Sequence, residues 1–199
     1  LLLIVAVACP LVKPPSAEPV PAGSLPAGTV PLAVAVDEYR EVTFFASRRG
    51  VATLPVAGGD AAWADLAPLG SAEVVGAISP EPELVVLALS DGRLLPVDVK
   101  TEVTFEEGKR RVRADVRASE PITVGAEGRP ATAFKYVRGP DGPIALAATG
   151  PRELALVRVR ETTNMMGDTT REESRGALAL TVLGEVSALA VDSRGQDAF

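Results

Sequence analysis

Residues Pro31–Val56 read PLAVAVDEYREVTFFASRRGVATLPV: an apolar strand, a polar turn, a second apolar strand, a turn of small residues and glycine, and a third strand. The same order returns at Val75–Lys100 and at Ala131–Arg160, and a further copy begins within Val186–Phe199. Successive copies start about 44, 56 and 55 residues apart. A unit of strands that recurs at such intervals predicts an array of small antiparallel sheets.

The repeat predicts an all-β fold, an incomplete β-propeller-like (WD40-like) array of antiparallel blades over residues 31–199. Each copy has the length of a blade of three or four strands. Roughly four to eight blades close a propeller, so three copies and part of a fourth indicate a piece of a longer array with an exposed sheet edge.

Two segments make the strand prediction specific. Leu84–Leu89 (LVVLAL) is a short, continuous apolar run that predicts a strand buried on both faces, and Ser90-Asp91-Gly92 then predicts a hairpin turn. Residues 97–118 alternate between apolar and charged positions around Glu106–Lys109, which predicts a long hairpin with one packed and one wet face. Phe105 falls on the packed side, and acidic residues of one strand face arginines of the other.

The third copy predicts one strand at Leu154–Arg160, a polar stretch at Glu161–Ser174 and a returning strand at Gly176–Leu183. A turn is expected near Asn164–Asp168, with Met165-Met166 at its tip or filling the core. Trp63 lies in AAWADL, where periodicity leaves a helical turn and a strand equally open.

The first residues differ from the rest. Leu1–Val12 (LLLIVAVACPLV) is almost wholly apolar, but twelve helical residues rise only about 18 Å against a bilayer core of about 30 Å. We interpret it as the end of a transmembrane helix, with a signal peptide or a buried strand as alternatives, because Lys13 and Pro14-Pro15 follow where a helix would leave the lipid. Residues 13–30 form a Pro-rich linker.

Composition excludes several kinds of site. The 199 residues carry a net charge of −6 and no basic stripe, so nucleic acid is not an expected partner. There is no histidine, and Cys9 is the one cysteine, so neither a histidine-based catalytic site nor a cysteine zinc site can form in this chain. The glycine-containing turns lack the pattern of a phosphate-binding loop. We therefore predict no enzyme activity, no catalytic, cofactor-binding or metal-binding residue, and no cofactor.

The segment Leu87–Gly125 (LALSDGRLLPVDVKTEVTFEEGKRRVRADVRASEPITVG) resembles the soluble insert of Pst-type phosphate ABC transporter permeases of bacteria. Leu154–Glu173 and Val186–Arg194 are similar to later parts of that insert. In this family a transmembrane helix precedes a WD40-like propeller region outside the cytoplasm, and further transmembrane helices follow. The permease core has no counterpart in these residues, so no transport residue is carried over.

The resemblance implies an extracytoplasmic accessory or scaffold domain of a phosphate ABC transporter permease subunit, whose parent protein imports inorganic phosphate. It implies the bacterial inner membrane with the soluble part periplasmic, attachment by the N-terminal helix, and partners among the other transporter subunits and the phosphate-binding protein. The alternatives are a secreted or lipid-anchored β-propeller that binds protein, and an enzyme on a propeller scaffold. We expect binding to use the turns Asp37–Arg40, Ser79–Glu83 and Arg138–Gly142.

Overall fold

The structure is a computed structural model that describes residues 23–106, 108–125, 128–163, 165–179, 181, 186 and 188–192. The segment Leu1–Val12 and the first part of the linker, 13–22, lie outside these residues. Within the described part, no helix has both the length and the apolar character needed to cross a membrane.

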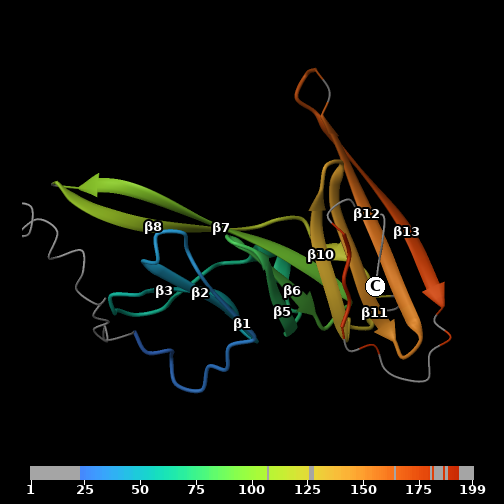
Figure 1. Ribbon diagram of the computed structural model, residues 1–199, viewed down its shortest axis with the longest axis horizontal. Helices are drawn as coiled ribbons and strands as arrows, with labels where there is room; N and C mark the ends of the chain where they lie inside the picture. Colours follow the sequence, from blue (N-terminus) through green and yellow to red (C-terminus); the bar gives the residue numbers. More distant parts are fainter. Residues whose placement is uncertain are drawn as a thin grey trace, which may run out of the picture.

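The described chain folds into three antiparallel sheets that occupy successive stretches of the sequence (Figure 1). In each sheet, strands consecutive in the chain pair with one another to form a meander, to which the second sheet adds β9 (Ile122–Thr123) beside β7. The first sheet contains β1 (Ala33–Val36), β2 (Val42–Ser47), β3 (Gly50–Pro55) and β4 (Ala62–Trp63). The second contains β5 (Val74–Glu81), β6 (Leu84–Leu89), β7 (Arg93–Glu106), β8 (Lys109–Ala118) and β9. The third contains β10 (Ala133–Gly139), β11 (Gly142–Gly150), β12 (Glu153–Thr163) and β13 (Thr169–Ala179).

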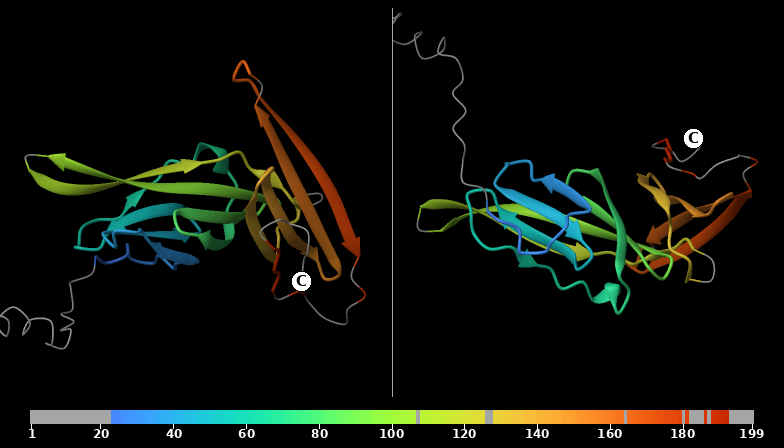
Figure 2. Two further views of the ribbon diagram at one scale, coloured as in Figure 1. Left: turned by 45° about the horizontal axis from the view of Figure 1, so that its top comes forward. Right: turned by 90° about the horizontal axis from the view of Figure 1, so that it is seen from below.

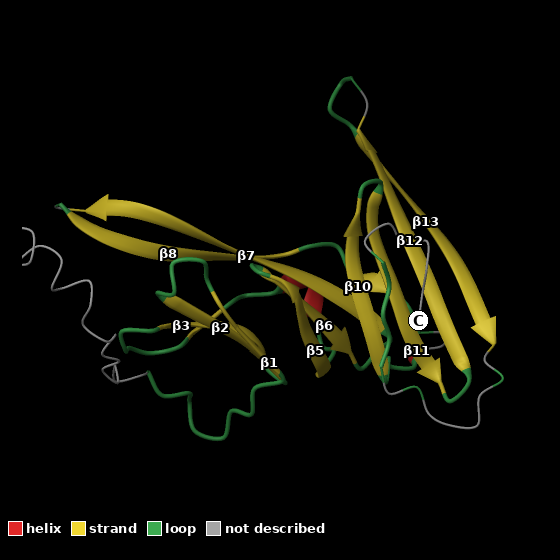
Figure 3. Ribbon diagram, in the orientation of Figure 1, coloured by secondary structure: helices red, strands yellow, loops and turns green. Residues whose placement is uncertain are grey.

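The expectation of an all-β fold is confirmed: strands and loops make up nearly all of the described chain, with one 3-10 turn, η2 (Ala67–Leu69), between the first and second sheets (Figure 3). Trp63, which periodicity left open, lies in the short strand β4. The described sheets remain separate and do not close into a ring.

The second sheet packs between the other two. Alternate residues of β6 face opposite ways: Val85, Leu87 and Leu89 join a core with the first sheet, built around Phe44 and Val51. The other three, Leu84, Val86 and Ala88, join a core with the third sheet. All six are at most 1% exposed, so the predicted strand with two buried faces is confirmed.

The first strands of the three sheets neighbour one another. β5 contacts both β1 and β10. The short leading strands therefore line up across the stack, while the long hairpins β7–β8 and β12–β13 extend away from it (Figures 1 and 2).

The β7–β8 hairpin confirms the expected register, with Val97 opposite Ala118 and Val103 opposite Val112. One expectation about its side chains was wrong. Phe105 is 72% exposed, because the layer that buries Val99 does not reach the hairpin tip. Asp98 lies opposite Arg117 as expected but forms its ion pair with Arg138 of the third sheet.

The β12–β13 hairpin is longer than its apolar pattern suggested. The stretch 161–174 was expected to separate two strands, yet Glu161 pairs with Arg171 and Thr163 with Thr169 in a continuous ladder. Cross-strand pairing through threonines and alternating charges extends the hairpin beyond its apolar part. The expected turn is present, with Met165 and Met166 exposed at its tip.

Candidate binding surface

The turn between β1 and β2 is built on one buried carboxylate. The side chain of Asp37 belongs to a residue that is only 3% exposed. Its carboxylate oxygens accept hydrogen bonds from the backbone N–H groups of Tyr39, Glu41 and Val42, with N···O distances of 3.0, 2.8 and 2.7 Å. These bonds hold Arg40 at a φ of 57°, in the left-handed region. Of the predicted binding turn Asp37–Arg40, the side chain of Asp37 is thus structural, while Glu38, Tyr39 and Arg40 are exposed.

The turn between β5 and β6 is fixed by a serine. The hydroxyl of Ser79 donates toward the carbonyl oxygens of Leu84 and Glu81, at 3.1 and 3.3 Å. Glu83 adopts a φ of 64° and accepts a hydrogen bond of 3.2 Å from the Thr101 hydroxyl. The predicted turn Ser79–Glu83 is therefore held against the long strand β7.

The turn between β10 and β11 begins at Arg138, whose guanidinium donates to Asp98 in the second sheet. Burial alone would lower the pKa of Arg138, but the hydrogen bond to Asp98 and its charge outweigh burial and raise that pKa. Tyr136 is 4% exposed, and burial raises the pKa of its hydroxyl despite the opposing charge of Arg138. The predicted turn Arg138–Gly142 thus belongs to the junction of two sheets.

Ion pairs link the first and third turns to the second sheet. Arg110 of β8 pairs with Glu41 and stacks on the ring of Tyr39 at 5.2 Å, which ties the second sheet to the first turn. The pKa of the Tyr39 hydroxyl is raised, mainly by its hydrogen bond with Glu38 and with a smaller contribution from the charge of Glu83 in the second turn. Glu81 of that turn in the same way contributes to the raised pKa of Tyr136.

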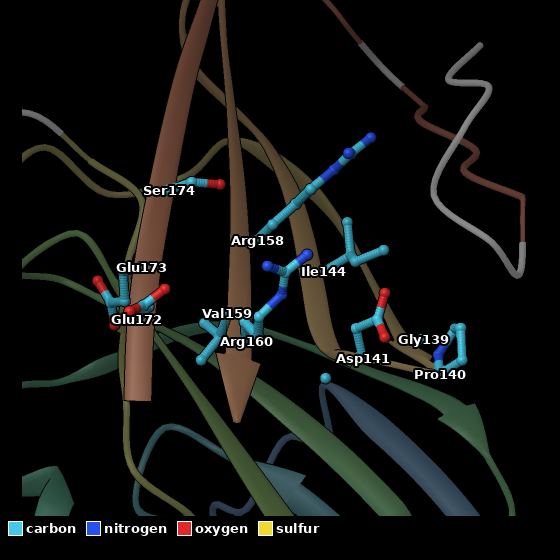
Figure 4. A pocket seen from close by; sticks show the side chains of 11 residues that line it. Gly139, Pro140, Asp141, Ile144, Arg158, Val159, Arg160, Glu172, Glu173 and Ser174 are labelled. Carbon is cyan, nitrogen blue, oxygen red and sulfur yellow. The ribbon is translucent and has the colours of Figure 1, made fainter. Parts of the chain in front are cut away.

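A hollow of about 340 Å³ lies against the third turn (Figure 4). Arg158 and Arg160 of β12 and Asp141 of the turn surround it, with Glu172 and Ser174 supplied by β13. The apolar part of its lining includes Ile144. The lining thus combines charged side chains of both signs with apolar ones.

A second hollow, of about 260 Å³, lies on the other side of the same turn, between the second and third sheets. Tyr136, Arg138 and Arg171 line it together with Glu120 and Glu161. Gly139 and Gly142 line both hollows, so the β10–β11 turn separates them.

Arg171 is the residue of this surface that sequence reasoning missed. Its side chain is only 16% exposed and pairs with Glu120 at 2.5 Å and Glu173 at 3.1 Å, and it donates to the Pro121 carbonyl oxygen at 3.3 Å. Its Nε is buried without a hydrogen-bond partner. The sequence placed Arg171 in a polar stretch between two strands, so it predicted neither a strand face nor a partner for this side chain.

The surface carries charges of both signs. Among the described residues, no three carboxylate, cysteine or histidine side chains come together as a metal site would require. The side-chain hydrogen bond from Arg93 lowers the pKa of the Asp91 carboxyl. No family model, curated protein or solved structure matches this chain.

Proposed function

We propose that this chain is a binding scaffold: part of a β-propeller-like array that presents the β1–β2, β5–β6 and β10–β11 turns to a protein partner. The observation that carries this proposal is the stack itself. Three antiparallel meanders in chain order pack face to face with their first strands adjacent, as successive propeller blades do. Propellers commonly bind partners through the turns at one end of the blades.

We further propose that the scaffold is the extracytoplasmic part of a phosphate ABC transporter permease subunit of the bacterial inner membrane, with the phosphate-binding protein or another subunit as its partner. The support is the resemblance of Leu87–Gly125 to that insert, joined to an all-β stack that carries mixed charge at its turns. The proposed role is docking or spacing, and phosphate import belongs to the parent protein.

The structure allows a sharper test than exchange of whole turns, because Asp37 and Arg138 hold the fold. The combined variant Glu38→Lys, Arg40→Glu and Asp141→Lys changes only exposed side chains at two of the turns. Arg152→Glu, in the exposed β11–β12 turn, is the matched control. We expect the combined variant in the full-length protein to lose binding of the phosphate-binding protein and to reduce phosphate uptake, with the control unchanged.

Equal binding and uptake by both variants would contradict the docking role. The coding sequence on either side of the chain tests the transporter assignment separately. Further transmembrane helices after Phe199 with a permease coupling loop would support it, whereas a signal peptide and more strand repeats alone would favour the secreted or lipid-anchored propeller.

A further inference from the structure

The outer face of the first sheet carries a hollow of about 600 Å³ that shares no residue with the three turns. Trp63 of β4 lies on this face, since it packs with Phe45, Ala52 and Leu54 in a cluster separate from the core shared with the second sheet. One wall is the incoming chain Pro26–Val30 with Leu32, and the opposite wall is the β2–β3 turn. We refer to it as the Trp63 hollow.

The aromatic platform of the Trp63 hollow is fixed from two sides. The ring of Phe45, itself 1% exposed, meets Trp63 edge-on, with 5.6 Å between ring centroids and an interplanar angle of 80°. The guanidinium of Arg49 lies 4.7 Å from the Trp63 ring centroid, and the backbone N–H of Arg49 donates to the hydroxyl of buried Ser47 at 3.2 Å. A guanidinium stacked in this way keeps its in-plane N–H donors available.

The hollow is locally cationic in an acidic chain. Arg48 and Arg49 both line it, both are exposed, and neither is paired with a carboxylate among the described residues. Three other arginines at turns or sheet junctions, by contrast, are paired: Arg93 with Asp91, Arg110 with Glu41 and Arg138 with Asp98. The net charge of −6 makes two adjacent unpaired arginines a specific attraction for an anion.

Two apolar side chains of the lining are accessible. Val30 is 72% and Leu32 is 36% exposed, and both line the hollow opposite the arginines. A bound apolar group would remove this surface from water, which is favourable by about 25 cal/mol per Å². The volume lies within the range of roughly 300–1,000 Å³ typical of small-molecule sites.

We propose that the Trp63 hollow binds a small organic anion: a carboxylate or phosphate group carried on an apolar or aromatic body. Arg48 and Arg49 donate to the acidic group, and Trp63, Val30 and Leu32 contact the body. Both parts are required, because an exposed ion pair alone contributes little in water and the apolar walls alone are shallow.

Trp63 is the one tryptophan of the chain, so its fluorescence reports on this hollow directly. The probe is cyclohexanecarboxylate, which does not absorb light at the wavelengths that excite the Trp63 indole and so does not disturb the fluorescence signal. Calorimetry gives an independent measurement of the same binding. Cyclohexylmethanol supplies the body without the charge, and acetate and inorganic phosphate supply charge without the body. We expect saturable binding of cyclohexanecarboxylate, and binding of the three controls that is about tenfold weaker or absent.

The matched variants are Arg48→Gln with Arg49→Gln, against Arg152→Gln in the equivalent exposed turn of the third sheet. The double variant should lower the affinity about tenfold or more, and Arg152→Gln should leave it unchanged. The single variant Arg49→Lys should keep only part of the wild-type affinity, because a lysine side chain cannot stack on Trp63 as a planar guanidinium does. Absence of a saturable change up to roughly 10 mM probe, or equal affinity in the double variant and the control, overturns the proposal.

Discussion

The Arg138 guanidinium, at the end of the third sheet's first strand, donates to the Asp98 carboxylate in the long strand of the second sheet. A matching junction joins Arg110 of the second sheet to Glu41 of the first. An ion pair therefore accompanies each of the two sheet-to-sheet contacts, beside the apolar cores that join the sheets.

The Arg138–Asp98 pair should contribute measurably to stability, because the two side chains are 44% and 25% exposed and so only partly screened by water. A double-mutant cycle of Arg138→Gln and Asp98→Asn should give a coupling of about 0.5–1 kcal/mol that falls as salt is added. The control is the Arg117–Asp115 pair, 76% and 44% exposed, whose cycle should give a coupling near zero. Equal coupling energies in the two cycles would show that the Arg138–Asp98 pair does not stabilise the junction between the second and third sheets.

The stack should unfold as one cooperative unit, since β6 contributes to both apolar cores. Leu84→Ala removes packing against the third sheet and Leu87→Ala removes packing against the first, and each should cost about 2–5 kcal/mol. The fluorescence of Trp63, in the first sheet, should report the same shifted midpoint in urea for both variants. Leu178→Ala, at a residue 51% exposed, should change the midpoint little. If Leu84→Ala left the midpoint of the Trp63 fluorescence transition unchanged, the sheets would unfold separately.

Strands with an apolar face could be predicted from residue order alone. The apolar run Leu84–Leu89 and the alternation of residues 97–118 specify strands and register, because burial on one or both faces leaves a direct trace in the order of residues. The β12–β13 ladder from Glu161 to Arg171 left no such trace, since its cross-strand pairs are polar on both sides.

Long-range charge pairs were beyond sequence reasoning. Asp98 has Arg117 opposite in its own hairpin, yet it pairs with Arg138, 40 residues away, because the third sheet packs on that face of β7. Arg171 pairs with Glu120 for the same reason. Which face of a strand meets the neighbouring sheet depends on how the sheets stack, and a single strand's alternation does not contain that information.

Alkaline pH should destabilise the fold through Tyr136. Burial raises the pKa of its hydroxyl in the folded state above the ordinary value of about 10. The contribution of neutral Tyr136 to the free energy of unfolding is therefore fully present below about pH 10 and is lost as pH rises from there through the folded-state pKa. The free energy of unfolding should therefore fall as pH rises above about 10 more steeply in the wild type than in Tyr136→Phe. Identical slopes in the wild type and Tyr136→Phe would contradict this assignment.

Adding a side chain at Gly142 should destabilise the fold more than the same change at an ordinary turn glycine. It has a φ of 131°, and a Cβ there would lie 2.2 Å from the Val159 carbonyl oxygen in the paired strand β12. Gly108, in the β7–β8 turn, has a φ of 75° with nothing near a Cβ, so Gly108→Ala carries only the left-handed backbone cost of about 1 kcal/mol. Gly142→Ala must also displace β12 and should cost about 3 kcal/mol, as measured by urea unfolding.

Because Gly142 lines both hollows beside the third turn, the same displacement should lower the affinity for any partner bound there, whereas Gly108→Ala should leave binding intact. Equal losses of stability in the two variants would mean that the close approach of the β10–β11 turn to β12 is not maintained in solution.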